Sequence, residues 1–324
     1  MKHESVVWGA LGLLSSLSWT GLASASPCAQ GDFRPGQLVI VITNPPCLVV
    51  CDETGTPVEV IDNFEHFDPW GRHNPADSVF DWNRETLFLL TAVSGLNFES
   101  LLVDFDQAHP HDCSYGVAVA AGGLTDSVTV ARDAAGNLYF GNYNTESCCT
   151  QLIHKHSPDM ALQVGYIVEG GSHQDGIYGL DVTADGRFLY YACEGLKIYD
   201  TLTATQLPGM SIPEGAGPDI KLLPPFDGSG GLLVSAVTSM VPSRVRRLAA
   251  DGSSQQIYDF GGGYVRGLDL DPSATSFWAI TSSPEALTRV NIATGAIEVG
   301  PIAMGNVGAT HVTVIGKSPK IRRR

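Results

Sequence analysis

Short apolar strands separated by turns recur along this chain at a nearly constant interval. One strand of each unit reads, in chain order, "TLFLLTA", "NLYFGN", "RFLYYAC", "GLLVSAV" and "SFWAIT". A turn containing Asp, Gly, Asn or Pro precedes it, and another apolar strand precedes the turn. The units begin near Asp77, Asp126, Asp175, Asp219, Arg266 and His311. The steps between them are 49, 49, 44, 47 and 45 residues, an even period that indicates a repeat architecture.

Each unit continues with a third strand such as "LKIYD" or "LTRVNI", and most add a fourth such as "QQIYDF". Four strands in a period of forty to fifty residues are typical of a propeller blade. The N-terminal region supplies "QLVIVIT", "CLVVCDETG" and "PVEVID", which lack a first strand, and "THVTVIG" (Thr310–Gly316) is a strand without a unit. The sequence therefore predicts an all-β, six-bladed β-propeller with four-stranded blades, closed by pairing of the C-terminal strand with the N-terminal strands. A β-sandwich would explain neither the period nor the complementary ends.

Composition agrees with many short strands and turns. The chain has 36 Gly and 19 Pro among 324 residues, and only 16% of its residues are charged. Its formal net charge of −15 repels phosphate backbones, so nucleic acid is excluded as an expected partner.

The N-terminus reads as a secretory signal peptide. The apolar stretch Val6–Trp19 is too short to span a bilayer, and the small residues Ala23-Ser24-Ala25 follow it. We expect cleavage after Ala25 and a soluble secreted or periplasmic product without a transmembrane segment. The predicted divisions are a signal peptide over 1–25, a propeller domain over 26–316 and a basic disordered tail over 317–324. We expect the product to be a monomer.

Seven cysteines remain after that cleavage: Cys28, Cys47, Cys51, Cys113, Cys148, Cys149 and Cys193. In an oxidising compartment some of them should form disulfides. Cys47 and Cys51 lie in one apparent strand, which separates their Cα atoms by about 13 Å, too far for a mutual bond. Cys148 or Cys149 could pair with Cys193.

Two segments, "VARDAAGNLYFGN" and "VTADGRFLYYA…LKIYD", carry a family resemblance. They resemble the NHL-type and YVTN-type repeats of secreted bacterial propellers, and the blades of the gluconolactonase (senescence marker protein) superfamily. That resemblance implies a divalent metal at the propeller axis, held by Glu, Asn and Asp side chains, which polarises a lactone carbonyl. By local alignment Asp126, Asp175 and Asp219 fall at or beside the metal-holding positions, and Asp77 falls at the acidic one.

Residues at the start of each innermost strand should converge on the central channel, where propellers bind ligands. The candidate ligand-binding residues are Asp77, Asp126, Asp175, Asp219, Arg266 and His311. Asp126, Asp175 and Asp219 are the candidates for a metal site that holds Ca²⁺ or Mg²⁺. His311 and Arg266 could serve as a general base and an anion clamp. Alternatively, an Asp before a strand caps a turn by accepting backbone N–H bonds.

Two functional hypotheses follow. The first is a secreted binding or interaction module for a protein, glycan or small ligand. It is favoured by predicted loops over Asn63–Asp77, Gln107–Gly123 and Gly209–Pro218 and by the lack of GxSxG, HExxH or phosphate-binding motifs. The alternative is a metal-dependent lactonase, hydrolase or lyase of the gluconolactonase kind. A pair of histidines in one strand, His154 and His156, is expected at a solvated blade edge.

Overall fold

A computed structural model describes residues 34–43, 46–61, 73–81, 86–93, 100–106, 116–118, 127–142, 150–159, 161–170, 176–213, 215–236, 244–305 and 307–316. The predicted signal peptide, the basic tail and the candidates Asp126 and Asp175 lie outside these residues, as do Cys148 and Cys149. The described part of the chain consists of strands joined by turns, as the composition predicted. It includes no helix long and apolar enough to cross a membrane.

The described strands form six four-stranded antiparallel sheets, whose strands are named below from the innermost to the outermost. The first sheet contains β24 (Ala309–Val314), β1 (Leu38–Thr43), β2 (Pro46–Cys51) and β3 (Pro57–Ile61). The second contains β4 (His73–Asp81), β5 (Thr86–Val93), β6 (Ser100–Asp106) and β7 (Gly116–Ala118). The third contains β8 (Ser127–Arg132), β9 (Leu138–Asn142), β10 (Thr150–His156) and β11 (Leu162–Glu169).

The remaining three sheets follow the same order. The fourth contains β12 (Gly179–Val182), β13 (Phe188–Ala192), β14 (Leu196–Asp200) and β15 (Thr205–Met210). The fifth contains β16 (Ala216–Leu222), β17 (Leu232–Ala236), β18 (Arg244–Leu248) and β19 (Ser254–Asp259). The sixth contains β20 (Val265–Leu270), β21 (Ser276–Ser282), β22 (Glu285–Asn291) and β23 (Ile297–Ala303).

The pairing predicted between the two ends of the chain is present. β24 runs antiparallel to β1, with Leu38 opposite Val314 and Val41 opposite His311. Beyond the strands, the Ile315 amide donates to the Gln37 carbonyl at 2.7 Å. The first sheet therefore takes its inner strand from the C-terminal end and its other three strands from the N-terminal end.

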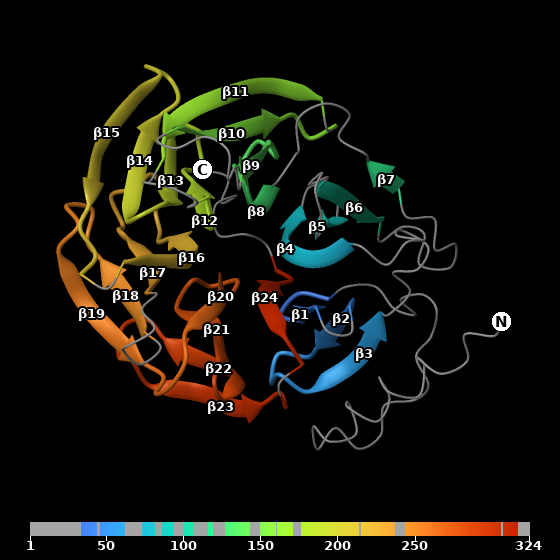
Figure 1. Cartoon of the computed structure of the whole chain (residues 1–324). Coiled ribbons are helices and arrows are strands. Elements are labelled where there is room, and N and C mark those ends of the chain that lie inside the picture. Colours follow the sequence, from blue (N-terminus) through green and yellow to red (C-terminus); the bar gives the residue numbers. More distant parts are fainter. Residues whose placement is uncertain are drawn as a thin grey trace.

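The six sheets are arranged around a common centre, with their first strands innermost and their fourth strands on the rim (Figure 1). Each first strand contacts the first strand of the next sheet. The contacts run from β4 to β8, β12, β16, β20 and β24, and from β24 back to β4. Side chains that point inward from these strands therefore meet at one place.

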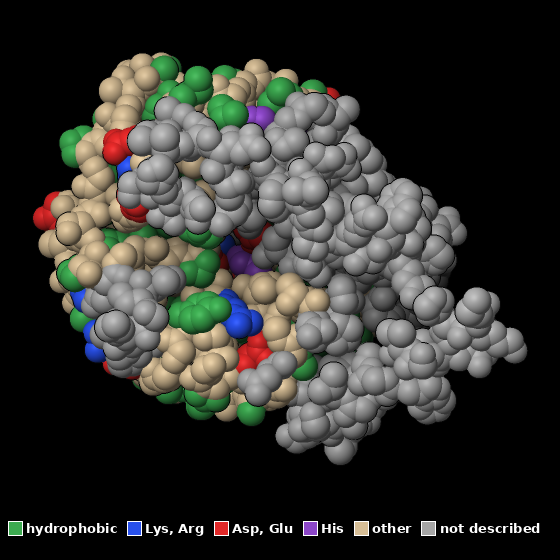
Figure 2. Space-filling model, viewed as in Figure 1, with side chains coloured by type: hydrophobic (Ala, Val, Ile, Leu, Met, Phe, Trp, Pro, Cys, Tyr) green, Lys and Arg blue, Asp and Glu red, His purple; other side chains and the backbone are tan. Residues whose placement is uncertain are grey.

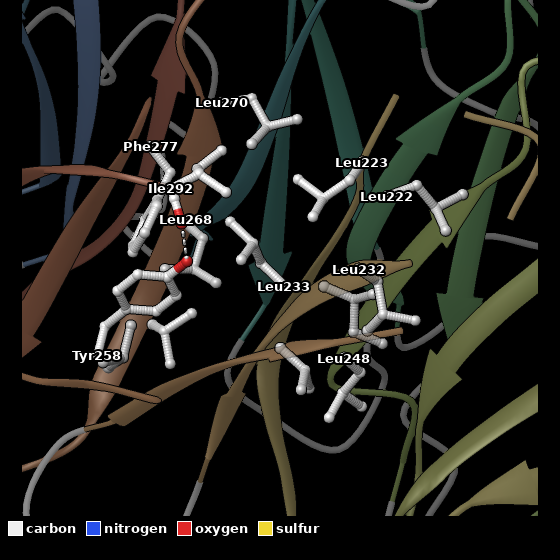
Figure 3. Close-up of a cluster of buried hydrophobic side chains, with 14 of the residues drawn as sticks. Leu222, Leu223, Leu232, Leu233, Leu248, Tyr258, Leu268, Leu270, Phe277 and Ile292 are labelled. Atoms are coloured by element: carbon white, nitrogen blue, oxygen red, sulfur yellow. Dashed lines mark hydrogen bonds between the residues drawn. The ribbon is translucent and has the colours of Figure 1, made fainter. Parts of the chain in front are cut away.

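Apolar side chains fill the spaces between the sheets. Figure 3 shows the cluster between the fifth and sixth sheets, which includes Leu233, Leu268 and Phe277, all essentially without solvent exposure. Tyr258 packs edge-on against Phe277 at 5.0 Å and donates from its hydroxyl to the Ile292 carbonyl at 2.6 Å. Burial of each such side chain stabilises the fold by roughly 1.5–3 kcal/mol, so these interfaces supply most of the driving force.

Two of the predicted loops are shorter than expected. Asp77 lies inside β4 rather than at the end of a loop, and the predicted loop Gly209–Pro218 is largely taken up by β15 and β16. The Gly and Pro residues of these segments predicted turns. In the fold, Gly209 lies in the outer strand β15 and Pro218 lies in β16, whose pairing with β17 is irregular. A side chain at Gly209 would reach within 2.6 Å of the Leu196 carbonyl oxygen, and β16 has a bulge between Ala216 and Ile220. The predicted loop Gln107–Gly123 contains β7.

The innermost strands approach one another most closely at Gly267. A Cβ atom there would lie 2.8 Å from the His311 Cα and 3.1 Å from the Thr310 carbonyl oxygen, both backbone atoms of β24. We expect Gly267→Ala to lower the free energy of unfolding by about 1–3 kcal/mol, because two backbones must separate to admit the methyl group. Urea unfolding measures the loss.

Gly165→Ala is the matched control for this prediction. It also lies in a strand, but its Cβ would meet only the side chains of His154, at 3.7 Å, and Leu152, at 3.9 Å, which are ordinary contacts. Its effect should remain within about 0.5 kcal/mol. Equal losses in the two variants would show that the β20–β24 approach is not tight.

Candidate functional site

Charged side chains from several first strands meet at the centre of the molecule. We call this group the axial cluster: Asp77, Asp181, Asp219, Lys221, Asp269 and His311. The His311 Nε2 lies 3.0 Å from Asp77 Oδ1, and its Nδ1 lies 3.5 Å from Asp219 Oδ2. On the opposite side of Asp219, Lys221 Nζ is 3.4 Å from Oδ1. Figure 2 shows a hollow at the centre of this face, with histidine and acidic and basic side chains within it.

Three of the six predicted site residues come together in this cluster. Asp77, Asp219 and His311 are each 4–6% exposed, although Asp77 and His311 are 234 residues apart in the sequence. The structure places these three side chains together, and their burial follows from the close packing of the first strands. Asp126 and Asp175 lie outside the described residues and stay predictions.

Neighbouring first strands place uncharged residues beside the axial cluster. Thr129 lies beside Asp77 and donates to its Oδ2 at 3.0 Å. Gly179 lies against the backbone of Pro218 and Asp219. Gly267, rather than Arg266, lies against His311. Thr and Gly at an inward position carry no charge, so the sequence offered no marker of the register there.

Asp77 and Asp219 each join the first strands of two neighbouring sheets. Asp77 accepts from the amide of Ser78 on its own strand at 2.7 Å and from the Val130 amide on β8 at 2.8 Å. Asp219 accepts from the amide of Ile220 on its own strand at 2.8 Å and from the Leu268 amide on β20 at 2.6 Å. One carboxylate therefore bridges two strands that have no ladder hydrogen bonds between them.

Asp181 and Asp269 repeat this arrangement one step further along the first strands. Asp181 accepts from the amides of Val182 and Leu222, at 2.8 and 2.7 Å. Asp269 accepts from the amides of Leu270 and Val314, at 2.9 and 2.7 Å. We term these four contacts, of Asp77, Asp181, Asp219 and Asp269, the aspartate bridges. The turn-capping alternative predicted that aspartates accept backbone N–H bonds. In the structure each of these four accepts one amide from its own strand and one from the first strand of the next sheet.

The sequence did not single out Asp181, Lys221 or Asp269. A signal was present: each is a charged residue inside an otherwise apolar first strand, in "GLDV", "DIKLL" and "GLDL". A charge at such a position is expensive unless it is paired, so its presence in a buried strand indicates a partner.

Lys221 is the positive charge of the axial cluster. Burial works against its charge, but Asp219, Asp269, Asp77 and Asp181 outweigh burial, so the pKa of Lys221 lies above its ordinary value. Burial raises the pKa of Asp219 and of Asp269, although Lys221 partly offsets this. One ammonium group thus balances part of the charge of four carboxyl groups.

The pKa values of Asp77 and His311 are shifted in opposite directions. Burial raises the pKa of Asp77 to about 6, while burial and Lys221 lower the pKa of His311 to about 4 against the pull of Asp219 and Asp269. The imidazole is therefore neutral at neutral pH. Its Nε2 is buried and has no hydrogen-bond partner among the described residues, despite its closeness to Asp77.

Arg266 has other partners than the predicted ones. Its Nη1 donates to the Ala309 carbonyl at 3.2 Å and lies 3.6 Å from Glu285 Oε1, and its guanidinium lies over the Tyr264 ring at 5.4 Å. Glu285 in turn accepts from the Ala309 amide at 2.6 Å. These contacts tie Arg266 to the start of β24 rather than to the imidazole of His311.

The predicted metal is poorly served by Asp219, the one member of its set that the structure describes. Both carboxylate oxygens already accept backbone amides, and Lys221 lies where a cation would have to compete with it. Among the described residues no group of three or more His, Cys, Asp and Glu is arranged to hold a metal ion. The Asp126 and Asp175 part of the set stays a prediction.

Two smaller expectations can be settled. Cys47 and Cys51 lie in one strand, β2, and Cys51 is a free thiol, so they form no mutual disulfide, as predicted. The solvated edge expected for His154 and His156 is wrong, because both are buried in β10 between two other strands. His156 packs edge-on against Phe140 at 5.2 Å.

Four-stranded sheets set around one centre, with their first strands innermost, define this molecule as a β-propeller. A chain of the crystal structure titled "Nidogen/Laminin Complex" has the same fold, with a TM-score of 0.60 over 87% of this chain and 99% of that one. The two chains are 8% identical, so the likeness concerns the fold alone. No protein-family model matches the sequence, and no curated protein matches it.

The aspartate bridges predict a stability effect. Asp181→Ala leaves the Leu222 amide of the next sheet without its acceptor, so we expect a loss of about 2–3 kcal/mol in the free energy of unfolding. Asp251→Ala is the control, because Asp251 makes bonds of the same kind to Ser253 but only within an exposed turn. Its loss in the same urea titration should be clearly smaller; equal losses would mean that the bridges do not stabilise the packing of the sheets.

The opposite pKa shifts of Asp77 and His311 predict opposite pH dependences for two variants. Between about pH 4 and 6 native Asp77 holds a proton that the unfolded chain has lost, so its contribution to stability falls as the pH rises. Native His311 lacks a proton that the unfolded chain holds from about pH 4 to 6.5, so its contribution rises with pH over this window. The two slopes oppose each other in the unaltered protein.

Relative to that protein, His311→Gln should therefore lose stability as the pH rises from 4 to 6. Asp77→Asn should gain stability over the same range. Each difference should be on the order of 2 kcal/mol. Urea unfolding at half-unit pH steps measures both, and parallel curves for all three proteins would exclude the two pKa shifts.

Proposed function

We propose that this chain is a secreted β-propeller interaction module whose ligand is another protein. The observation that carries the proposal is that the charged groups at the centre of the molecule already bind one another and the backbone. The aspartate bridges bind the molecule's own backbone and Lys221 balances their charge, so the axial cluster serves the packing of the sheets. The faces and the rim are then left for a partner.

The similar solved chain supports the same proposal, because its title names a complex of nidogen with laminin. We also propose that the six sheets act as six blades of one ring, which β24 closes through its pairing with β1. A rigid ring is suited to recognition because it holds its connecting segments in fixed positions. Secretion rests on the N-terminal segment that ends at Ala25.

The proposal is tested with the secreted product of the full chain, whose N-terminal residue should be Ser26. Proteins that it retains from the medium of its own source are identified and then prepared in pure form. We expect direct binding of at least one of them to the mature protein in biolayer interferometry. We expect the same affinity for Lys221→Met, if that variant folds, because Lys221 belongs to the packing and not to the binding surface.

A hydrolase assay separates the two functional hypotheses. The same preparation is assayed on a panel of lactones and esters, with and without Ca²⁺, Mg²⁺, Mn²⁺ and Zn²⁺. No turnover is expected. Metal-dependent hydrolysis that disappears in Asp219→Asn would overturn the proposal in favour of a lactonase, and so would the failure of every purified candidate to bind.

A further inference from the structure

The outer edge of β11 has no strand paired with it in the described part of the molecule. β11 is the fourth strand of its sheet and is bonded only to β10, through a regular register from Val164 opposite Lys155 to Glu169 opposite Thr150. The irregularity in this pairing lies at the other end, near Leu162. Alternate residues of this six-residue stretch therefore present backbone N–H and C=O groups outward. Glu169 is the exception, because its amide donates to Gln206 and its carbonyl accepts from the Tyr191 hydroxyl.

Four of the other five outer strands are protected against such pairing, whereas β19 has no proline and carries its one charge, Asp259, at its end. β3 starts at Pro57 and carries Glu59, β15 contains Pro208, and β23 contains Glu298 and Pro301. β7 is only three residues long, and β19 begins with the polar residues Ser-Gln-Gln. Proline, charge and shortness are the usual ways in which proteins prevent a sheet edge from pairing. β11 has eight residues, none of which is proline, and its one charge is at the end, on Glu169.

Apolar side chains are exposed along the same strand. Leu162, Val164 and Ile167 are 48%, 38% and 68% exposed, whereas β3, β19 and β23 each expose one large apolar side chain. Hydrophobic side chains are visible along this part of the rim in Figure 2. The register places Leu162 opposite His156 and Ile167 opposite Leu152, which share one face of the sheet. Val164 lies opposite Lys155 on the other face, so a strand added at the edge would cover apolar surface on both faces.

We propose that the outer edge of β11 is the docking site for an extended segment of a partner protein, which adds to the sheet as a fifth strand. The inference rests on the interaction function proposed above. The partner segment carries apolar residues at alternate positions, to match Leu162 and Ile167 on one face of the sheet. It is neutral or basic, because this chain has a net charge of −15 and a second copy would bring the same charge to the interface.

The probe is a displayed library of unstructured twelve-residue peptides, selected on the mature protein. We expect enriched peptides with apolar residues at alternate positions and no net negative charge. Leu162→Lys/Ile167→Lys should weaken their binding at least tenfold, because lysine on an edge strand opposes strand addition. Ile257→Lys/Ile297→Lys is the matched control on β19 and β23, with the same change in charge at sites 46% and 57% exposed.

Equal weakening in both double variants, or no enrichment of an alternating pattern, would overturn the assignment of the edge. Light scattering adds a further readout: a dimer that the β11 double variant converts to monomer would assign the edge to a second copy and overturn the partner proposal. Binding of a purified partner protein to both double variants distinguishes the β11 docking site from the interaction function as a whole. If the partner binds both double variants equally well, the β11 site fails while the interaction function stands.

Discussion

The molecule depends on one kind of interaction. An aspartate carboxylate accepts a hydrogen bond from an amide of its own strand and another from an amide of the next sheet. The first strands of neighbouring sheets share no ladder hydrogen bonds, so side chains are needed to hold these strands together. Asp77, Asp181, Asp219 and Asp269 do this for four neighbouring pairs of sheets. Between β24 and β4 the Thr313 and Ser78 hydroxyls meet at 2.6 Å and serve the same purpose with neutral groups.

Four buried carboxyl groups around one centre create an electrostatic problem that shapes the rest of the site. Taking carboxylates out of water costs several kcal/mol each unless they are paired and hydrogen-bonded. Lys221 supplies one positive charge, and backbone amides supply the hydrogen bonds. The raised pKa of Asp77 means that this carboxyl group binds a proton, and so loses its negative charge, at a higher pH than usual. His311 stays neutral because burial, together with Lys221, outweighs the carboxyl groups that favour its charged form. The centre is thus a balanced polar core rather than an open set of ligands.

The architecture could be predicted from the sequence, and the details of the site could not. Alternating apolar residues and turns define strands locally, which is why "RFLYYAC" and "SFWAIT" were placed within two residues of β13 and β21. Packing across the centre decides which residue of each first strand lies beside the axial cluster. In three strands that residue is Thr129, Gly179 or Gly267, none of which has a side chain that marks the position in the sequence. Lys221 was missed for a related reason: its role depends on four carboxyl groups that lie close only after all the sheets have formed.

The union of β24 with β1 also bears on how the molecule is made. During synthesis the strands β1, β2 and β3 leave the ribosome first, yet the sheet they belong to lacks its inner strand until residues 309–314 emerge. Contacts between segments so far apart in sequence carry a large loop-closure cost and form late. The nascent chain therefore holds an incomplete sheet with an open edge throughout its elongation, and it acquires its cooperative native structure only near the end of translation or after it.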